Sequence, residues 1–111
     1  MAYDEHYADE VRALLQGERG LTEKRMFGGL AFLVDGKMAV VVSGRGLLMI
    51  RVDEQTQDRL LARPGITQTL MRQRPMRGWL DADETVTSDE AALAELVRVA
   101  VAHVRTLPPK R

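Results

Sequence analysis

The 111-residue chain contains no cysteine, which excludes disulfide bonds, thiolate nucleophiles and cysteine-ligated metal sites. Its uninterrupted apolar runs, such as 38–42 and 47–50, are far shorter than the ~20 residues that a membrane-spanning helix needs. The first ten residues hold four acidic side chains and neither lysine nor arginine, unlike the basic start of a signal peptide. We therefore expect a soluble, cytoplasmic protein.

The composition that is present is ordinary for a globular protein, with 45% hydrophobic and 29% charged residues. A chain of this length falls within the size range of one domain and buries enough surface to fold without metals or disulfides. No internal repeat or low-complexity segment divides it. We expect residues 1–111 to form a single domain.

Apolar residues at helical spacing predict three helices. The first spans about 4–16 with Asp4 as its N-cap, and a short second helix runs from Asp53 to about residue 62. The third begins at Ser88, the expected N-cap, and ends before the prolines at 108–109. Its apolar stripe consists of Leu93, Leu96, Val97, Ala100, Val101 and Val104.

Strands are predicted at about 25–34, 37–43, 47–52, 66–71 and 77–80. Asp35-Gly36 joins the first two, as is typical of a two-residue type I′ hairpin in which both positions need positive φ. Pro75 argues against a continuous central strand around it. The expected fold is α+β, a two-layer antiparallel sheet with helices and the order α-β-β-β-α-β-β-α.

Two of the predicted strands are apolar at every position, over 38–42 and 47–50. A strand with one wet face alternates polar and apolar residues, so both faces of this sheet are expected to need cover. The three helices suffice for one face. The other is closed by the same chain or by a second copy, so a homodimer is one hypothesis.

Three motifs in a fixed order, together with the order of elements, suggest a family. They are Arg25–Phe32 (RMFGGLAF), Asp35–Met38 (DGKM) and Pro75–Leu80 (PMRGWL). Over about residues 7–107 the sequence resembles the N-terminal domain of the TfoX/Sxy family. The resemblance implies a small two-layer α+β domain and a bacterial cytoplasmic protein related to regulators of competence genes. Those regulators carry a further C-terminal domain, whereas this sequence stops at Arg111, so it resembles a stand-alone N-terminal domain.

The glycine pair Gly28-Gly29 lies inside the first predicted strand. A phosphate-binding loop needs a strand-to-helix junction with further glycines, so a bulge or a close backbone contact is the favoured interpretation. The alternative is that an anion or a partner backbone docks there beside Arg25.

The zero net charge conceals an uneven distribution. Residues 1–23 hold two basic residues against six acidic ones, residues 24–80 ten against four, and residues 81–111 four against six. Between Arg59 and Leu80 there are five arginines and no acid. Arginine suits phosphate and carboxylate recognition, and Trp79 beside Arg77 is a combination found in single-stranded nucleic-acid binders. The alternative is that these arginines pair with the acidic terminal helices and that Trp79 belongs to the core.

Nothing in the sequence indicates catalysis. His6 and His103 lack metal-ligand spacing, and neither Ser43 nor Ser88 has a nucleophile motif. We expect no catalytic residues, metal or cofactor, and a non-enzymatic regulatory or protein-interaction module. Direct nucleic-acid binding through 59–80 is the alternative, and a small-ligand protein or enzyme is third. The residues predicted to bind a partner or an anion are Arg25, Phe27, Gly28, Gly29, Arg72, Arg74, Arg77 and Trp79.

Overall fold

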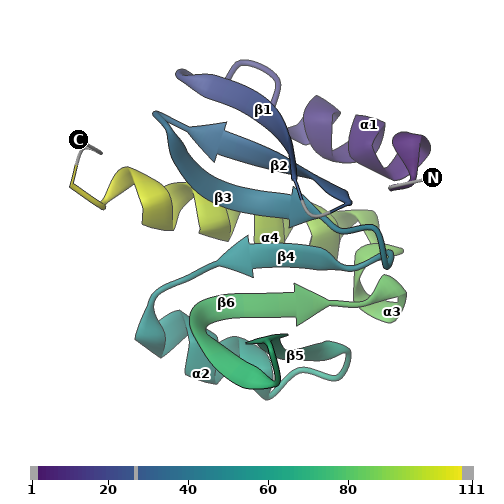
Figure 1. Ribbon diagram of the computed structural model, residues 1–111, viewed down its shortest axis with the longest axis vertical. Coiled ribbons are helices and arrows are strands. Elements are labelled where there is room, and N and C mark those ends of the chain that lie inside the picture. The colour runs from purple at the N-terminus through teal and green to yellow at the C-terminus, as the bar shows by residue number, and fades with distance from the viewer. Residues whose placement is uncertain (1–2, 27, 109–111) are drawn as a thin grey trace.

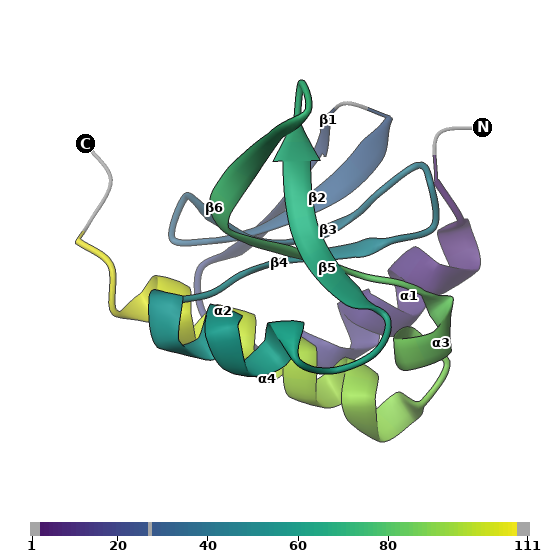
Figure 2. The same cartoon turned by 90° about the horizontal axis from the view of Figure 1, so that it is seen from below.

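The computed structural model describes residues 3–26 and 28–108. In this part of the chain six strands form one antiparallel sheet, and the helices lie along one of its faces (Figures 1 and 2). The strands are β1 (Leu21–Met26), β2 (Gly29–Val34), β3 (Lys37–Val42), β4 (Leu48–Arg51), β5 (Ile66–Met71) and β6 (Arg74–Ala82), in the spatial order β1-β2-β3-β4-β6-β5. The helices are α1 (Glu5–Leu14), α2 (Glu54–Leu61), α3 (Glu84–Thr87) and α4 (Glu90–Arg105). The expected α+β class is confirmed.

The predicted element order lacks one strand and one short helix. The segment 25–34, predicted as a single strand, contains the end of β1 and the whole of β2. Between them lies Gly28, whose φ of +75° allows the chain to reverse. The next reversal agrees with the prediction, because Asp35 and Gly36 both have positive φ (52° and 81°) between paired strands.

Pro75 lies inside β6, contrary to the prediction that a strand would begin only after it. The reason is that β6 extends beyond β4, since their register starts at Trp79 opposite Arg51. At Pro75 the described partner is Leu70 of β5 on one side only. A missing N–H is tolerated where a strand has a single neighbour.

The last helix is confirmed, but its predicted cap is wrong. Ser88 ends α3, and the N-cap of α4 is Asp89, whose carboxylate accepts hydrogen bonds from the amides of Ala91 and Ala92. Asp89 thus binds two of the first-turn amides that lack a partner within the helix, which is the capping role predicted for its neighbour Ser88. All six residues of the predicted apolar stripe are buried.

The main core lies between the helices and the sheet. Its largest fully buried sheet residues are Phe32, Val34, Val40, Val42, Leu48, Ile50 and Leu80. Arg12 fixes α1 to β1 by donating two hydrogen bonds to the carboxylate of Glu23, at 2.6 and 2.9 Å. Arg105 ties the end of α4 to Glu18 at 2.7 Å. No helix in the described part of the chain is long and apolar enough to cross a membrane.

Candidate functional site

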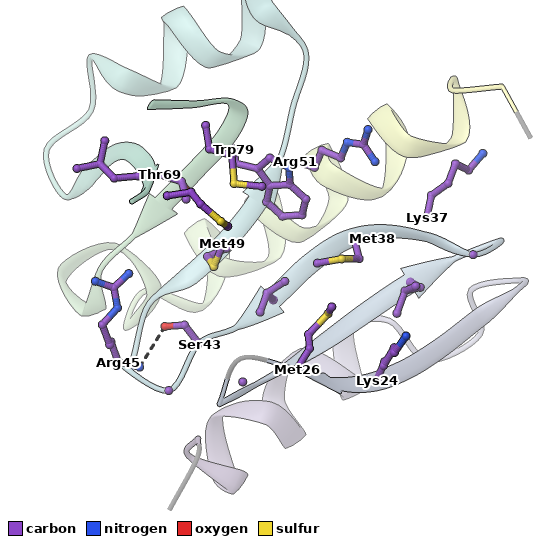
Figure 3. Close-up of a pocket in the computed structure, with 18 of the residues that line it drawn as sticks. Lys24, Met26, Lys37, Met38, Ser43, Arg45, Met49, Arg51, Thr69 and Trp79 are labelled. Atoms are coloured by element: carbon purple, nitrogen blue, oxygen red, sulfur yellow. Dashed lines mark hydrogen bonds between the residues drawn. The ribbon is translucent and has the colours of Figure 1, made fainter. Parts of the chain in front are cut away.

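The sheet face opposite the helices is concave and forms a groove of about 980 Å³ (Figures 2 and 3). Side chains alternate between the two faces of a strand, so every second residue points into it. A small second core, separate from the main one, makes its floor: Ala31, Val41 and Trp79 are buried, with Met26, Leu33, Met38, Met49 and Met76 packed around them.

Two irregularities in strand pairing occur in this curved sheet. The pairing register shifts between Phe32 and Leu33 on β2, and again between Gln68 and Leu70 on β5. Such irregularities bend a strand and increase its twist. The side-chain amide of Gln68 donates to the carbonyls of Met76 and Trp79, both at 2.9 Å, which holds the β5–β6 pair in its bent form.

Methionine dominates the lining, so we call this surface the methionine groove. It contains Met26, Met38, Met49, Met71 and Met76, which are all the methionines among the described residues. None of them belongs to the core beneath the helices. Methionine is unbranched and flexible and adapts to differently shaped apolar partners.

The charged residues that line the methionine groove are all cationic: Lys24, Lys37, Arg45 and Arg51. They come from β1, the β2–β3 hairpin, the β3–β4 loop and the end of β4, and so surround the apolar floor (Figure 3). The ammonium of Lys37 also donates to the carbonyl of Leu107 at 3.1 Å. Among the described residues no carboxylate lines the groove.

One acidic residue lies buried at the edge of this floor. Asp81 of β6 accepts a hydrogen bond from the hydroxyl of Thr69 at 2.7 Å, and both side chains are buried. Asp81 is the register partner of Met49, so the two share a face of the sheet. The hydroxyl of Thr69 therefore supplies the hydrogen bond that a buried carboxylate needs.

The structure separates Arg25 from Gly29, two of the four site residues predicted around the glycine pair. Arg25 pairs in register with Leu30, which belongs to the core under the helices, so Arg25 points away from the groove. Phe27 lies outside the described residues. Gly28 is exposed in the turn, and Gly29 lines the groove. A Cβ on Gly29 would meet the carbonyl oxygen of Val42 at 2.6 Å, so the close-backbone interpretation holds for Gly29.

The predicted arginines do not form one surface. Arg72 and Arg74 are exposed at the β5–β6 turn, and Arg77 pairs with Glu54 of α2. Within the wider segment Arg63 pairs with Glu95 of α4 at 3.0 Å. Trp79 is 7% exposed and belongs to the floor of the groove, as the core interpretation predicts.

The sequence interpretation missed the methionines and Lys24, Arg45 and Arg51. A signal existed in the two uniformly apolar strands. With alternating side chains, Val40 and Val42 fall on one face and Val41 on the other, and Met49 likewise faces away from Leu48 and Ile50. Alternation thus separates the flexible Met49 from its branched neighbours, but it does not indicate which face the helices cover.

Groups with shifted pKa values lie in or beside the helical layer. Burial lowers the pKa of His103 on α4, with Asp53 opposing and Arg51 adding to that effect. Burial raises the pKa of Tyr7 on α1. Among the described residues no cluster of three histidine or acidic side chains could hold a metal. The groove therefore offers apolar surface and positive charge, the properties of a binding site.

Comparison with known proteins identifies the family. No curated protein matches the chain. The family model of the TfoX N-terminal domain matches residues 13–104, which run from within α1 to within α4 and include every strand. The match contains all three motifs on which the resemblance was based. The chain therefore belongs to the TfoX N-terminal domain family.

Proposed function

We propose that this protein is a non-enzymatic regulatory module that binds a protein partner in the methionine groove. The observation that carries the proposal is an apolar sheet face that none of the described helices covers. Apolar surface of this extent, bordered by charged residues, is typical of interaction sites. Membership of the TfoX N-terminal domain family supports a role related to the regulation of competence genes.

The contents of the groove support binding rather than catalysis. An active site brings together titratable groups whose environments shift their pKa values. The groove instead combines thioethers, aliphatic side chains, an indole and cations around its border. The five arginines that suggested nucleic-acid binding are dispersed. Arg72 and Arg74 lie at a hairpin tip, Arg59 is exposed on α2, and Arg63 and Arg77 form ion pairs with α4 and α2.

The test is capture of partners from a lysate of the encoding organism, with and without nuclease treatment, using two variants of matched chemistry. Met38→Glu places a carboxylate in the groove, whereas Leu14→Glu places one on α1, where Leu14 is already 42% exposed. We expect wild type and Leu14→Glu to capture the same protein and Met38→Glu to lose it. Thermal unfolding monitors folding of both variants. Capture by a folded Met38→Glu variant, or capture that nuclease abolishes, contradicts the proposal.

A further inference from the structure

We infer that the occupant of the methionine groove is an amphipathic helix of a partner protein, with acidic residues beside its apolar stripe. The inference rests on the proposed function and adds the chemistry and shape of the partner. It combines the charge around the groove, the width of the floor and the exposed apolar residues on one wall.

The charge around the groove indicates the sign of the charge on the partner. Lys24, Arg45 and Arg51 come from separate strands and loops. Asp81 on the same face is buried and hydrogen-bonded to Thr69, so the charge that the described residues expose at the groove is positive. Complementary charge accelerates association and rejects partners of the wrong sign. A helix with glutamate or aspartate on its flanks meets this border, whereas a basic helix is repelled by it.

The same border disfavours a second copy of this chain. A two-fold contact places the same surface of both protomers together. Lys24 and Arg45 of one copy would then meet a groove border that is also entirely cationic. Nucleic acid is disfavoured for a different reason, because Trp79 is 7% exposed and its ring lies in the floor, where it offers no free face for a base.

The distance across the floor, from one edge of the sheet to the other, matches the length of a helix. Lining residues come from β1 at one edge of the sheet and β5 at the other, so the floor crosses six strands. Strands lie about 4.8 Å apart, which gives roughly 24 Å across, and a helix rising 1.5 Å per residue covers this in about 16 residues. On the opposite face α4, itself a helix of 16 residues, lies across β2, β3 and β4.

One wall of the groove is incomplete without an occupant. Leu70 and Met71, at the end of β5, line the groove and are 57% and 48% exposed. They belong to the part of the β5–β6 pair that extends beyond β4, as the register of Trp79 with Arg51 shows. A helix lying on the floor contacts this wall, and the flexible Met71 adapts to its surface.

The experiment measures binding of three fluorescent 16-residue peptides to the full chain by anisotropy. The first has an apolar stripe flanked by glutamates, the second has the same composition in scrambled order, and the third carries lysine in place of glutamate. We expect the first to bind at least about tenfold more tightly than the others, with an affinity that falls as salt rises. Equal binding of the acidic and basic peptides, or of the ordered and scrambled ones, overturns the inference.

Two matched variants locate the site. The double reversal Lys24→Glu/Arg45→Glu removes cations from the groove border, whereas Arg98→Glu reverses an exposed cation on α4. We expect the double reversal to weaken binding of the acidic peptide about tenfold and to reduce the salt dependence of that binding. Cations at the border of a site contribute to both the affinity for an acidic partner and its sensitivity to salt. Arg98→Glu should leave both unchanged. An equal effect of the two variants overturns the inference.

A fourth probe, laurate, separates a helix from a small anionic amphiphile. The inference fails if laurate binds one to one to the wild type, Met38→Glu abolishes that binding, and the acidic peptide does not bind. The outcome of the lysate capture is independent of these probes. If capture depends on Met38 but no acidic peptide binds, the proposed function stands and only the helical, acidic partner is wrong. If capture ignores Met38, the proposed function itself fails.

Discussion

The two faces of the sheet are built from different apolar side chains. The face under the helices carries Phe32, Val40 and Ile50, all fully buried. The concave face carries Met38 and Met49, both partly buried. Valine and isoleucine are stiff at χ1 and pack in one arrangement, whereas methionine has three rotatable bonds and packs in many.

The covered face has permanent neighbours, so rigid and complementary packing there stabilises the fold. If a partner binds the open face, as we propose, its flexible side chains can adapt to a surface that is absent during folding. On that proposal one sheet divides stability and binding between its two faces. The following predictions test that division, from the largest expected effect to the smallest.

The largest contrast is expected between one truncation on each face. Phe32→Ala removes a fully buried side chain beneath the helices and should lower the free energy of unfolding by about 3–5 kcal/mol. Met38→Ala, at a partly buried position, should cost less than about 2 kcal/mol and still weaken binding of the acidic peptide. Urea unfolding gives both values. Equal losses of stability would show that the two faces contribute alike to the fold.

Substitutions in the glycine pair compare a position on the concave face, Gly29, with its neighbour in the turn, Gly28. Gly29→Ala places a Cβ 2.6 Å from the carbonyl oxygen of Val42 on β3, so the backbone must move, and we expect a loss of about 3 kcal/mol. Gly28→Ala meets no neighbour within 4 Å and costs only the strain of φ +75°, about 1 kcal/mol. Gly28→Asn should cost less still, since asparagine adopts positive φ more readily. A larger loss for Gly28→Ala than for Gly29→Ala would contradict the close contact.

The smallest effect concerns pH and belongs to the helical layer. Burial lowers the pKa of His103 in the folded protein below 6.5. The unfolded chain therefore binds the proton more tightly, and stability is complete above about pH 6.5 and falls as the pH drops through the folded value. His103→Gln should reduce this loss, measured as the shift in urea midpoint between pH 7.5 and pH 5.5.

Glu23 acts in the same direction at lower pH. The guanidinium of Arg12 lowers its pKa below 4.5, so its contribution is present above that value and is lost as the carboxylate protonates. The contribution of Glu23 should therefore be lost below about pH 4.5 in wild type and in His103→Gln alike. A variant whose midpoint shifts as much as that of wild type between pH 7.5 and 5.5 would show that His103 contributes nothing to the acid sensitivity.

Much of the fold was predictable because its signals are local. The stripe from Leu93 to Val104 determines which side of α4 is buried, and the two positive φ angles at Asp35-Gly36 follow from residues that accept them. The errors arose where a neighbouring element decides the outcome. Pro75 is tolerated inside β6 because β4 ends before reaching it. The residues near Pro75 do not reveal where β4 ends.

The candidate site was predicted less well, for a related reason. Arg25 and Lys24 are adjacent in sequence, yet the pleat puts Arg25 on the helical side and Lys24 at the groove. Arg77 looked free for an anion, but α2 supplies Glu54 beside it. Charge and residue type were readable, whereas the face and the partner of each side chain were not.

The sequence by itself determined the α+β class, the buried stripe of α4, the Asp35-Gly36 hairpin and the presence of apolar side chains on both faces of the sheet. These follow from periodicity and backbone preference, which act over a few residues. The tertiary structure decided which of the two apolar faces the helices cover. Alternation distributes side chains to two faces, but only long-range packing determines which face stays open. In this structure the open face is the one that carries the described methionines.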